Sequence, residues 1–180
     1  MPRDAHHSFR IQGCVGLLQP FRSLEDKQMK LPLTGSCQCR NVRFQCTAAP
    51  ASIYACHCTE CQRLSGSAFG TSMLVPRDGF SVTQGTPRSW VRTSESGRRV
   101  ECVFCPDCGT RLVHLPEHSP AMAIMRPGAL DDTSWIRLAG HIWTRSKQPW
   151  FEVPPGSVTY EQQPPDFSRL IEAYRAMAQG

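Results

Sequence analysis

Most of the chain alternates between apolar and polar residues over short stretches, as strands with one buried face do. Val42, Phe44 and Cys46, for example, recur at every second position. The same reasoning predicts further strands at residues 52–56, 68–75, 80–83, 88–92, 99–104, 111–114, 121–125 and 136–143. Turn sequences such as Arg77-Asp78-Gly79 separate these segments. The pattern therefore predicts a mainly β protein.

Helical spacing is clear only near the end of the chain. Asp166 follows two prolines and is suited to capping a helix. The apolar residues that share one face of this helix are Phe167, Leu170, Ile171, Tyr174 and Met177. Residues 149–165 contain five prolines and are interpreted as an extended connector. We therefore expect one zinc-binding domain over residues 31–155, followed by the connector and helix over 156–180.

Residues 1–30 show neither alternation nor a helical stripe, and we expect them to form a disordered extension in which Met29 offers an internal start. They also lack the charged, apolar and small-residue order of a signal peptide. No run of about 18 apolar residues suggests a membrane span. These features predict a cytoplasmic protein without a membrane partner.

Cysteine spacing carries the chemical signal, because seven of the ten cysteines fall into three close groups. In a reducing cytosol such spacing indicates metal ligands, whereas a secreted protein would use it for disulfides. Cys105-Pro106-Asp107-Cys108-Gly109 is a two-residue gap followed by a glycine that can take a positive φ. Cys37 and Cys39, at i and i+2 of an extended segment, point to one side. Together the two pairs supply the four sulfurs of a closed zinc site.

The middle group, Cys56, Cys58 and Cys61, has no evident fourth protein ligand. Three thiolates leave one zinc position open, and a soft thiol from outside suits it. His57 should point to the opposite face. The alternative is a second closed site, completed by one of the histidines His57, His114, His118 or His141.

The remaining cysteines and the charge change the picture little. Cys46 and Cys102 lie in strand alternation and are expected to pack as small apolar residues, and Cys14 falls in the extension. Two zinc ions and seven thiolates would reduce the formal charge of +5 to about +2. Basic residues form no run of five, which argues against a nucleic-acid partner.

Five motifs follow one another along the chain: Gly35-Ser-Cys-Gln-Cys, Cys56-His-Cys-Thr-Glu-Cys, Cys105-Pro-Asp-Cys-Gly, Gly128-Ala-Leu-Asp131 and His141-Ile-Trp. In this order the chain resembles the glutathione-dependent formaldehyde-activating enzyme family, which includes centromere protein V. The resemblance covers roughly residues 33–152. It implies a tent-like fold of two antiparallel sheets with zinc at their junction. It also implies a structural zinc on Cys37, Cys39, Cys105 and Cys108, and a catalytic zinc on Cys56, Cys58 and Cys61.

One position departs from the family pattern, because Arg40 stands where glycine is usual. If that turn needs a positive φ, Arg40 is strained.

The resemblance further implies a carbon–sulfur lyase that joins glutathione, or a related thiol, and formaldehyde into S-(hydroxymethyl)glutathione. His57 is a weak candidate for the proton donor because of its inferred direction. Arg63, Arg98 and Arg99 are either partners for the two carboxylates of glutathione or solvated surface charges. The alternative function is a non-enzymatic zinc module that binds a protein or chromatin, as the centromere relative suggests.

Overall fold

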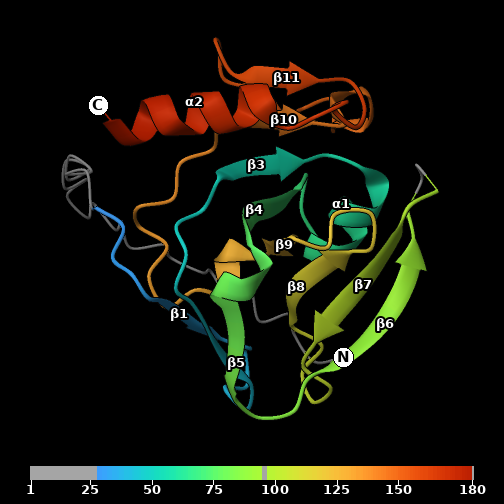
Figure 1. Ribbon diagram of the computed structural model, residues 1–180. Helices are drawn as coiled ribbons and strands as arrows, with labels where there is room; N and C mark the ends of the chain where they lie inside the picture. Colours follow the sequence, from blue (N-terminus) through green and yellow to red (C-terminus); the bar gives the residue numbers. More distant parts are fainter. Residues whose placement is uncertain (1–27, 95–96, 180) are drawn as a thin grey trace, which may run out of the picture.

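The computed structural model describes residues 28–94 and 97–179, and two β-sheets dominate it (Figure 1). The smaller sheet has the strand order β1-β2-β5, with β1 Leu33–Ser36, β2 Arg43–Cys46 and β5 Phe80–Gln84. The larger sheet has the order β11-β10-β3-β4-β9-β8-β7-β6. Its strands are β3 Ser52–Cys56, β4 Gly70–Pro76, β6 Arg88–Thr93, β7 Arg99–Phe104, β8 Arg111–Pro116, β9 Met122–Met125, β10 Gly140–Ile142 and β11 Val158–Tyr160.

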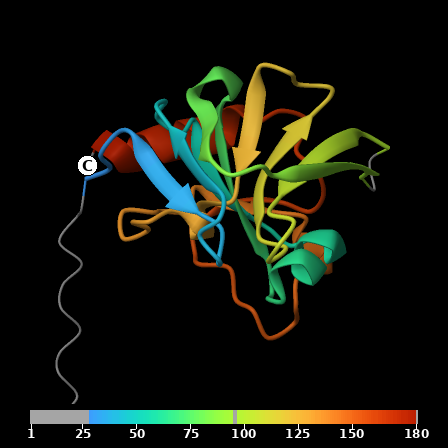
Figure 2. The same cartoon turned by 90° about the horizontal axis from the view of Figure 1, so that it is seen from below.

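The chain passes directly from the larger sheet to the smaller one. After β4, a single 3-10 turn over Arg77–Gly79 redirects it into β5. Figure 2 shows the smaller sheet, with β1 in blue, to one side of the yellow strands of the larger sheet. The main apolar core includes residues of both sheets, and Phe44 of β2, Met73 of β4 and Leu112 of β8 are fully buried in it. Cys37 and Cys105 belong to the same core. The predicted mainly β fold of two sheets with a C-terminal helix is confirmed.

The larger sheet is mixed, whereas the family resemblance implied two antiparallel sheets. β10 pairs parallel with β3 on one side and with β11 on the other. The strand predicted over residues 136–143 shortens to Gly140–Ile142, because Ile136 is bonded in a turn to Thr133 and the chain first meets β3 at Ala139. β11 lies in the segment predicted as a connector. It approaches Gly140 so closely that a Cβ there would lie 2.2 Å from the Val158 carbonyl oxygen.

The C-terminal helix α2, Ser168–Gln179, packs across β3 and the β10–β11 edge (Figure 1). Asp166 caps it as predicted, since its Oδ1 accepts from the Ser168 amide at 2.8 Å. Leu170 is fully buried, whereas Met177, placed on the same face by the sequence, is 49% exposed.

A short helix, α1 Thr59–Ser65, was not predicted, because its seven residues bury only Cys61. Its termini carry the signals instead. The Cys58 sulfur caps the first turn, and Gly66 ends the helix in the left-handed conformation with φ 60°. A recognisable stop therefore lay in the Ser65-Gly66 sequence.

The predicted extension falls almost wholly outside the described residues, so its disorder stays a prediction. Met29 packs against the main core cluster, and the domain therefore begins by that residue. Neither described helix has the length and hydrophobicity that crossing a lipid bilayer requires.

Arg40 occupies the left-handed region with φ 65°. The turn needs that conformation because Cys37 and Val42 bond across it: the Arg40 amide donates to the Cys37 carbonyl and the Cys37 amide to the Val42 carbonyl, each at 2.9 Å. A side chain at such a φ costs about 1 kcal/mol. The turn therefore does need a positive φ, and Arg40 is strained where the family usually has glycine.

Arg40→Gly should therefore raise the free energy of unfolding by about 0.5–1 kcal/mol, and Arg40→Val should lower it. Thermal unfolding of the metal-loaded protein measures both. Arg43→Gly is the matched control, since Arg43 is exposed on extended β2 and glycine weakens a strand. Equal shifts at the two positions would show that the turn imposes no strain.

Candidate functional site

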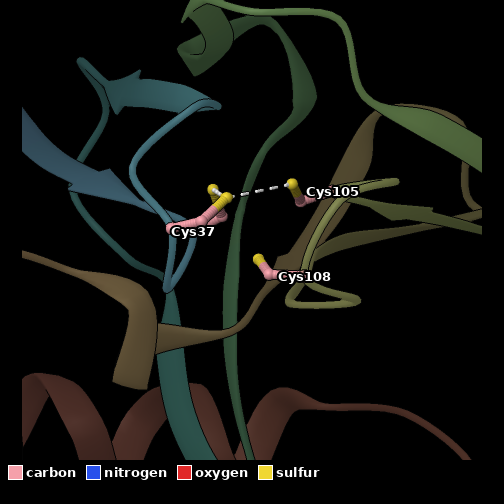
Figure 3. A group of neighbouring side chains, drawn as sticks. Cys37, Cys105 and Cys108 are labelled. Atoms are coloured by element: carbon pink, nitrogen blue, oxygen red, sulfur yellow. Dashed lines mark hydrogen bonds between the residues drawn. The ribbon is translucent and has the colours of Figure 1, made fainter.

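Two hairpin tips bring four cysteines together at the junction of the sheets. Cys37 and Cys39 lie in the β1–β2 turn, and Cys105 and Cys108 lie in the β7–β8 turn. Figure 3 shows Cys37 facing Cys105 and Cys108 across the gap between these turns. The Cys37 and Cys39 sulfurs are 3.4 Å apart, and those of Cys39 and Cys105 are 3.7 Å apart. All four sulfurs lie within 4.8 Å of one another, and the group could hold a metal ion.

Backbone and polar contacts hold the two tips in place. The Val42 amide donates to the Cys37 sulfur at 3.2 Å, and Gly109, with φ 73°, lets its amide return to the Cys105 carbonyl at 2.9 Å. Between the tips, Asn41 Nδ2 donates to Asp107 Oδ2 at 3.0 Å. These contacts orient the sulfurs toward a common centre.

The second cysteine group forms where β3 ends and α1 begins. Cys56 is the last residue of β3, Cys58 caps α1, and Cys61 lies in the first turn of the helix. The Cys61 amide donates to the Cys58 sulfur at 3.4 Å, which turns both side chains the same way. The three sulfurs lie within 4.8 Å of one another. The helix thus supplies the return of Cys61 that the sequence assigned to a turn.

No fourth histidine, cysteine, aspartate or glutamate joins this group among the described residues. His57 points away, as its position between Cys56 and Cys58 predicted. Its Nε2 lies 2.9 Å from Nδ1 of His141, and Phe69 and Phe151 pack against both rings. His57 is fully buried and does not line the cleft beside the cysteines, so it is badly placed as a proton donor.

Arg126 is the site residue that the sequence analysis missed. A Cβ on Gly70 would lie 3.2 Å from both Arg126 Nη1 and Cys61 Cβ, so the guanidinium and the cysteine pack together over this glycine. Arg126 Nη1 also donates to the Thr71 carbonyl at 3.1 Å and to Ser72 Oγ at 3.2 Å. β9 ends at Met125, so strand pairing with β4 fixes where Arg126 lies. No spacing rule in the sequence marks such a residue.

The thiols of the group share their protons unequally. Hydrogen bonds from Cys56 and Cys58 hold the pKa of Cys61 well below its usual range, and the adjacent Arg126 guanidinium lowers it further. The same thiol–thiol bonds raise the pKa of Cys56. The three thiols titrate as one coupled group, and their surroundings favour the ionised form at Cys61.

A second arginine and a neutral histidine extend this positive region. Arg111 Nη1 lies 2.9 Å from His114 Nε2, and Arg126 Nη2 lies 3.3 and 3.4 Å from the two ring nitrogens of His114. Burial, and then Arg126 and Arg111, lower the pKa of His114 well below its usual range. Neither Arg111 nor Arg126 forms an ion pair with a carboxylate of the described residues, unlike Arg63, which pairs with Glu60, and Arg99, which pairs with Glu117. The three-cysteine group therefore faces uncompensated positive charge.

A cleft opens onto the three sulfurs. Its wall is apolar around Tyr54, Val100 and Trp143, and its charged residues are Glu60, Arg92, Arg98 and Arg126. His114 and His118 also belong to the polar part of the lining. The cleft thus joins a group of soft sulfur ligands to a basic, partly apolar passage.

The donor sets suit zinc. Four sulfurs at zinc–sulfur bonds of about 2.3 Å would be about 3.8 Å apart at the corners of a tetrahedron. The separations of 3.4 and 3.7 Å in the four-cysteine group approach that value. The three-cysteine group offers the same type of ligand, but one sulfur fewer than a tetrahedral zinc ion binds. The other cysteines of the described chain stay apart from both groups: Cys46 and Cys102 are fully buried and bond to backbone carbonyls.

The fold and the two groups define a β-sheet protein with paired cysteine centres able to hold metal ions. The family model of the glutathione-dependent formaldehyde-activating enzyme matches residues 32–146. The chain belongs to this family.

Two individual proteins resemble the chain more loosely. An inferred glutathione-dependent formaldehyde-activating enzyme of Penicillium rubens is 35% identical over 78 residues, a match that spans 42% of this chain and 40% of that relative. A crystal structure of a Rhodobacter sphaeroides protein aligns with 71% of this chain and 98% of its own, at 17% identity and a TM-score of 0.46.

We expect Cys105→Ser to unfold the domain, because a metal shared by the two hairpin tips contributes roughly 10 kcal/mol or more to such folds. Circular dichroism and zinc content measure the result. Cys102→Ser is the matched control: it makes the same change at an equally buried position of β7. It should cost only about 1–3 kcal/mol and leave the zinc content unchanged. Equal losses in both variants would remove the four-cysteine assignment.

Proposed function

We propose that the protein is a zinc-dependent carbon–sulfur lyase that joins glutathione, or a related thiol, and formaldehyde into the S-hydroxymethyl adduct. The observation that carries the proposal is the three-cysteine group, which opens onto a cleft and has no fourth protein ligand among the described residues. Membership of the family supports the substrates. The proposal assigns Cys37, Cys39, Cys105 and Cys108 to a structural zinc and Cys56, Cys58 and Cys61 to a catalytic one. A cytoplasmic location would keep all these thiols reduced.

The reaction forms one bond and moves one proton. The thiolate sulfur attacks the carbonyl carbon, the π electrons of the carbonyl move to its oxygen, and that oxygen takes up a proton equivalent to the one the thiol lost. When bound, zinc would favour the thiolate form of the substrate at neutral pH. The cleft holds the two reactants beside each other, which lowers the entropic part of the barrier.

The chain's own contribution at the sulfurs is charge. Three cysteine thiolates and one substrate thiolate outweigh the charge of a divalent ion by two. Arg126, beside Cys61, and Arg111, behind His114, bring two positive charges without carboxylate partners in the described chain. These guanidiniums favour the state in which the substrate thiolate is present.

Reduced glutathione should bind the zinc-loaded protein and release about one proton, because its thiol ionises on binding. S-methylglutathione, which cannot ionise at sulfur, should bind far more weakly. Calorimetry in two buffers of different ionisation enthalpy reports the proton. Cys58→Ser should keep the fold and abolish this thiol-dependent heat. Equal binding of the two ligands would favour the closed, non-enzymatic zinc module instead.

Arg126→Met should weaken the binding of every thiol by about tenfold or more, since it removes a positive charge next to the thiolates. Arg126→Lys should recover part of the loss because it restores the charge without the hydrogen bonds to Thr71 and Ser72. Arg88→Met, at an exposed position of β6, is the control. If Arg126→Met binds thiols like the wild type while zinc content and fold are intact, the charge has no such role.

A further inference from the structure

The arginines near the cleft fall into two sets. Arg63 and Arg99, two of the three named from the sequence as carboxylate partners, are exposed and engaged elsewhere: Arg63 pairs with Glu60 at 2.6 Å and Arg99 with Glu117 at 3.0 Å. Arg98 lines the cleft with the cysteines, as does Arg92, which the sequence analysis did not single out. Within the described chain, neither Arg92 nor Arg98 has an ion-pair partner.

Arg92 and Arg98 lie at different depths along the cleft. Arg92, on β6, is half-buried, and its charge is close enough to Arg111 and His114 to lower the pKa of both. Arg98, just before β7, is exposed and lies 3.4 Å from His118 through Nη1. In Figure 1 the hairpin of β6 and β7 extends along the same side of the molecule as α1, which carries Cys61. Positive charge therefore continues from the sulfurs outward.

The lining matches a particular kind of thiol. Guanidiniums bind carboxylates through paired hydrogen bonds, so two arginines beyond the sulfur site suit two carboxylates. Glu60, the acidic residue of the lining, already pairs with Arg63, so the lining favours carboxylates over ammonium groups. Tyr54, Val100 and Trp143 provide an apolar wall for the carbon chain between the carboxylates. A thiol with two carboxylates, such as glutathione, presents the complementary set.

We propose that Arg92 and Arg98 form a carboxylate subsite that selects anionic thiols over neutral or cationic ones. The inference rests on the proposed function, because it requires the thiol sulfur to lie at the three-cysteine group. This role differs from that of Arg126. The charge of Arg126, beside the sulfurs, favours any thiolate, whereas Arg92 and Arg98 distinguish thiols by the carboxylates that lie far from the sulfur.

The test compares glutathione with its diethyl ester, which has the same thiol and no free carboxylate. Calorimetry on the zinc-loaded wild type should show glutathione binding about tenfold tighter or more. Arg92→Gln/Arg98→Gln should lose most of that preference by weakening glutathione alone, while its affinity for the ester stays within about twofold. Arg88→Gln/Arg99→Gln removes the same two charges from exposed positions that do not line the cleft and should keep the preference. It thereby controls for net charge.

The outcomes separate the two proposals. If the wild type binds glutathione and the ester equally, the subsite is absent although the open thiol site stands. If the control variant loses as much preference as the cleft variant, the effect belongs to net charge and the subsite is overturned. If the wild type binds neither thiol, the proposed function fails, and the subsite fails with it.

Discussion

The approach of thiols from distant parts of the chain to within 4.8 Å of one another is the constraint on which this structure depends. Cys37 and Cys105 are fully buried in the core between the sheets, yet each belongs to a group of sulfurs that would repel one another once ionised. A bound cation removes that repulsion and turns it into attraction. The small sheet has three short strands, and its β1–β2 turn supplies Cys37 and Cys39 to this junction.

The second group uses the same ligand chemistry in a different setting. It lies at the edge of a separate apolar cluster that includes Tyr54, Ile142 and Leu170, and it faces a cleft instead of a second hairpin. Its neighbours include the guanidiniums of Arg126 and Arg111, which form no ion pair with a carboxylate of the described residues. A closed group of four sulfurs and an open group of three thus follow from where the surrounding strands end.

The sequence predicted those features that depend on local spacing. Alternation located most strands, and the cysteine spacings separated a group of four from a group of three. His57 was correctly placed on the opposite face because adjacent residues of an extended segment point apart. The resemblance to a family with glycine after Cys39 also pointed to the strained φ of Arg40.

Features that depend on long-range pairing could not be predicted in this way. Arg126 acts beside Cys61 only because β9 pairs with β4, and β11 forms only because Gly140 admits its backbone. α1 is too short for its periodicity to be visible. Arg98 could be told apart from Arg63 and Arg99 only once their carboxylate partners were placed.

X-ray absorption at the zinc edge tests the central claim, one closed and one open zinc in each chain, most directly. Two zinc ions shared by seven cysteine sulfurs give a mean of about 3.5 sulfur ligands per zinc, and added glutathione should raise the mean to about 4. A single zinc per chain, or a coordination that glutathione leaves unchanged, would contradict the account.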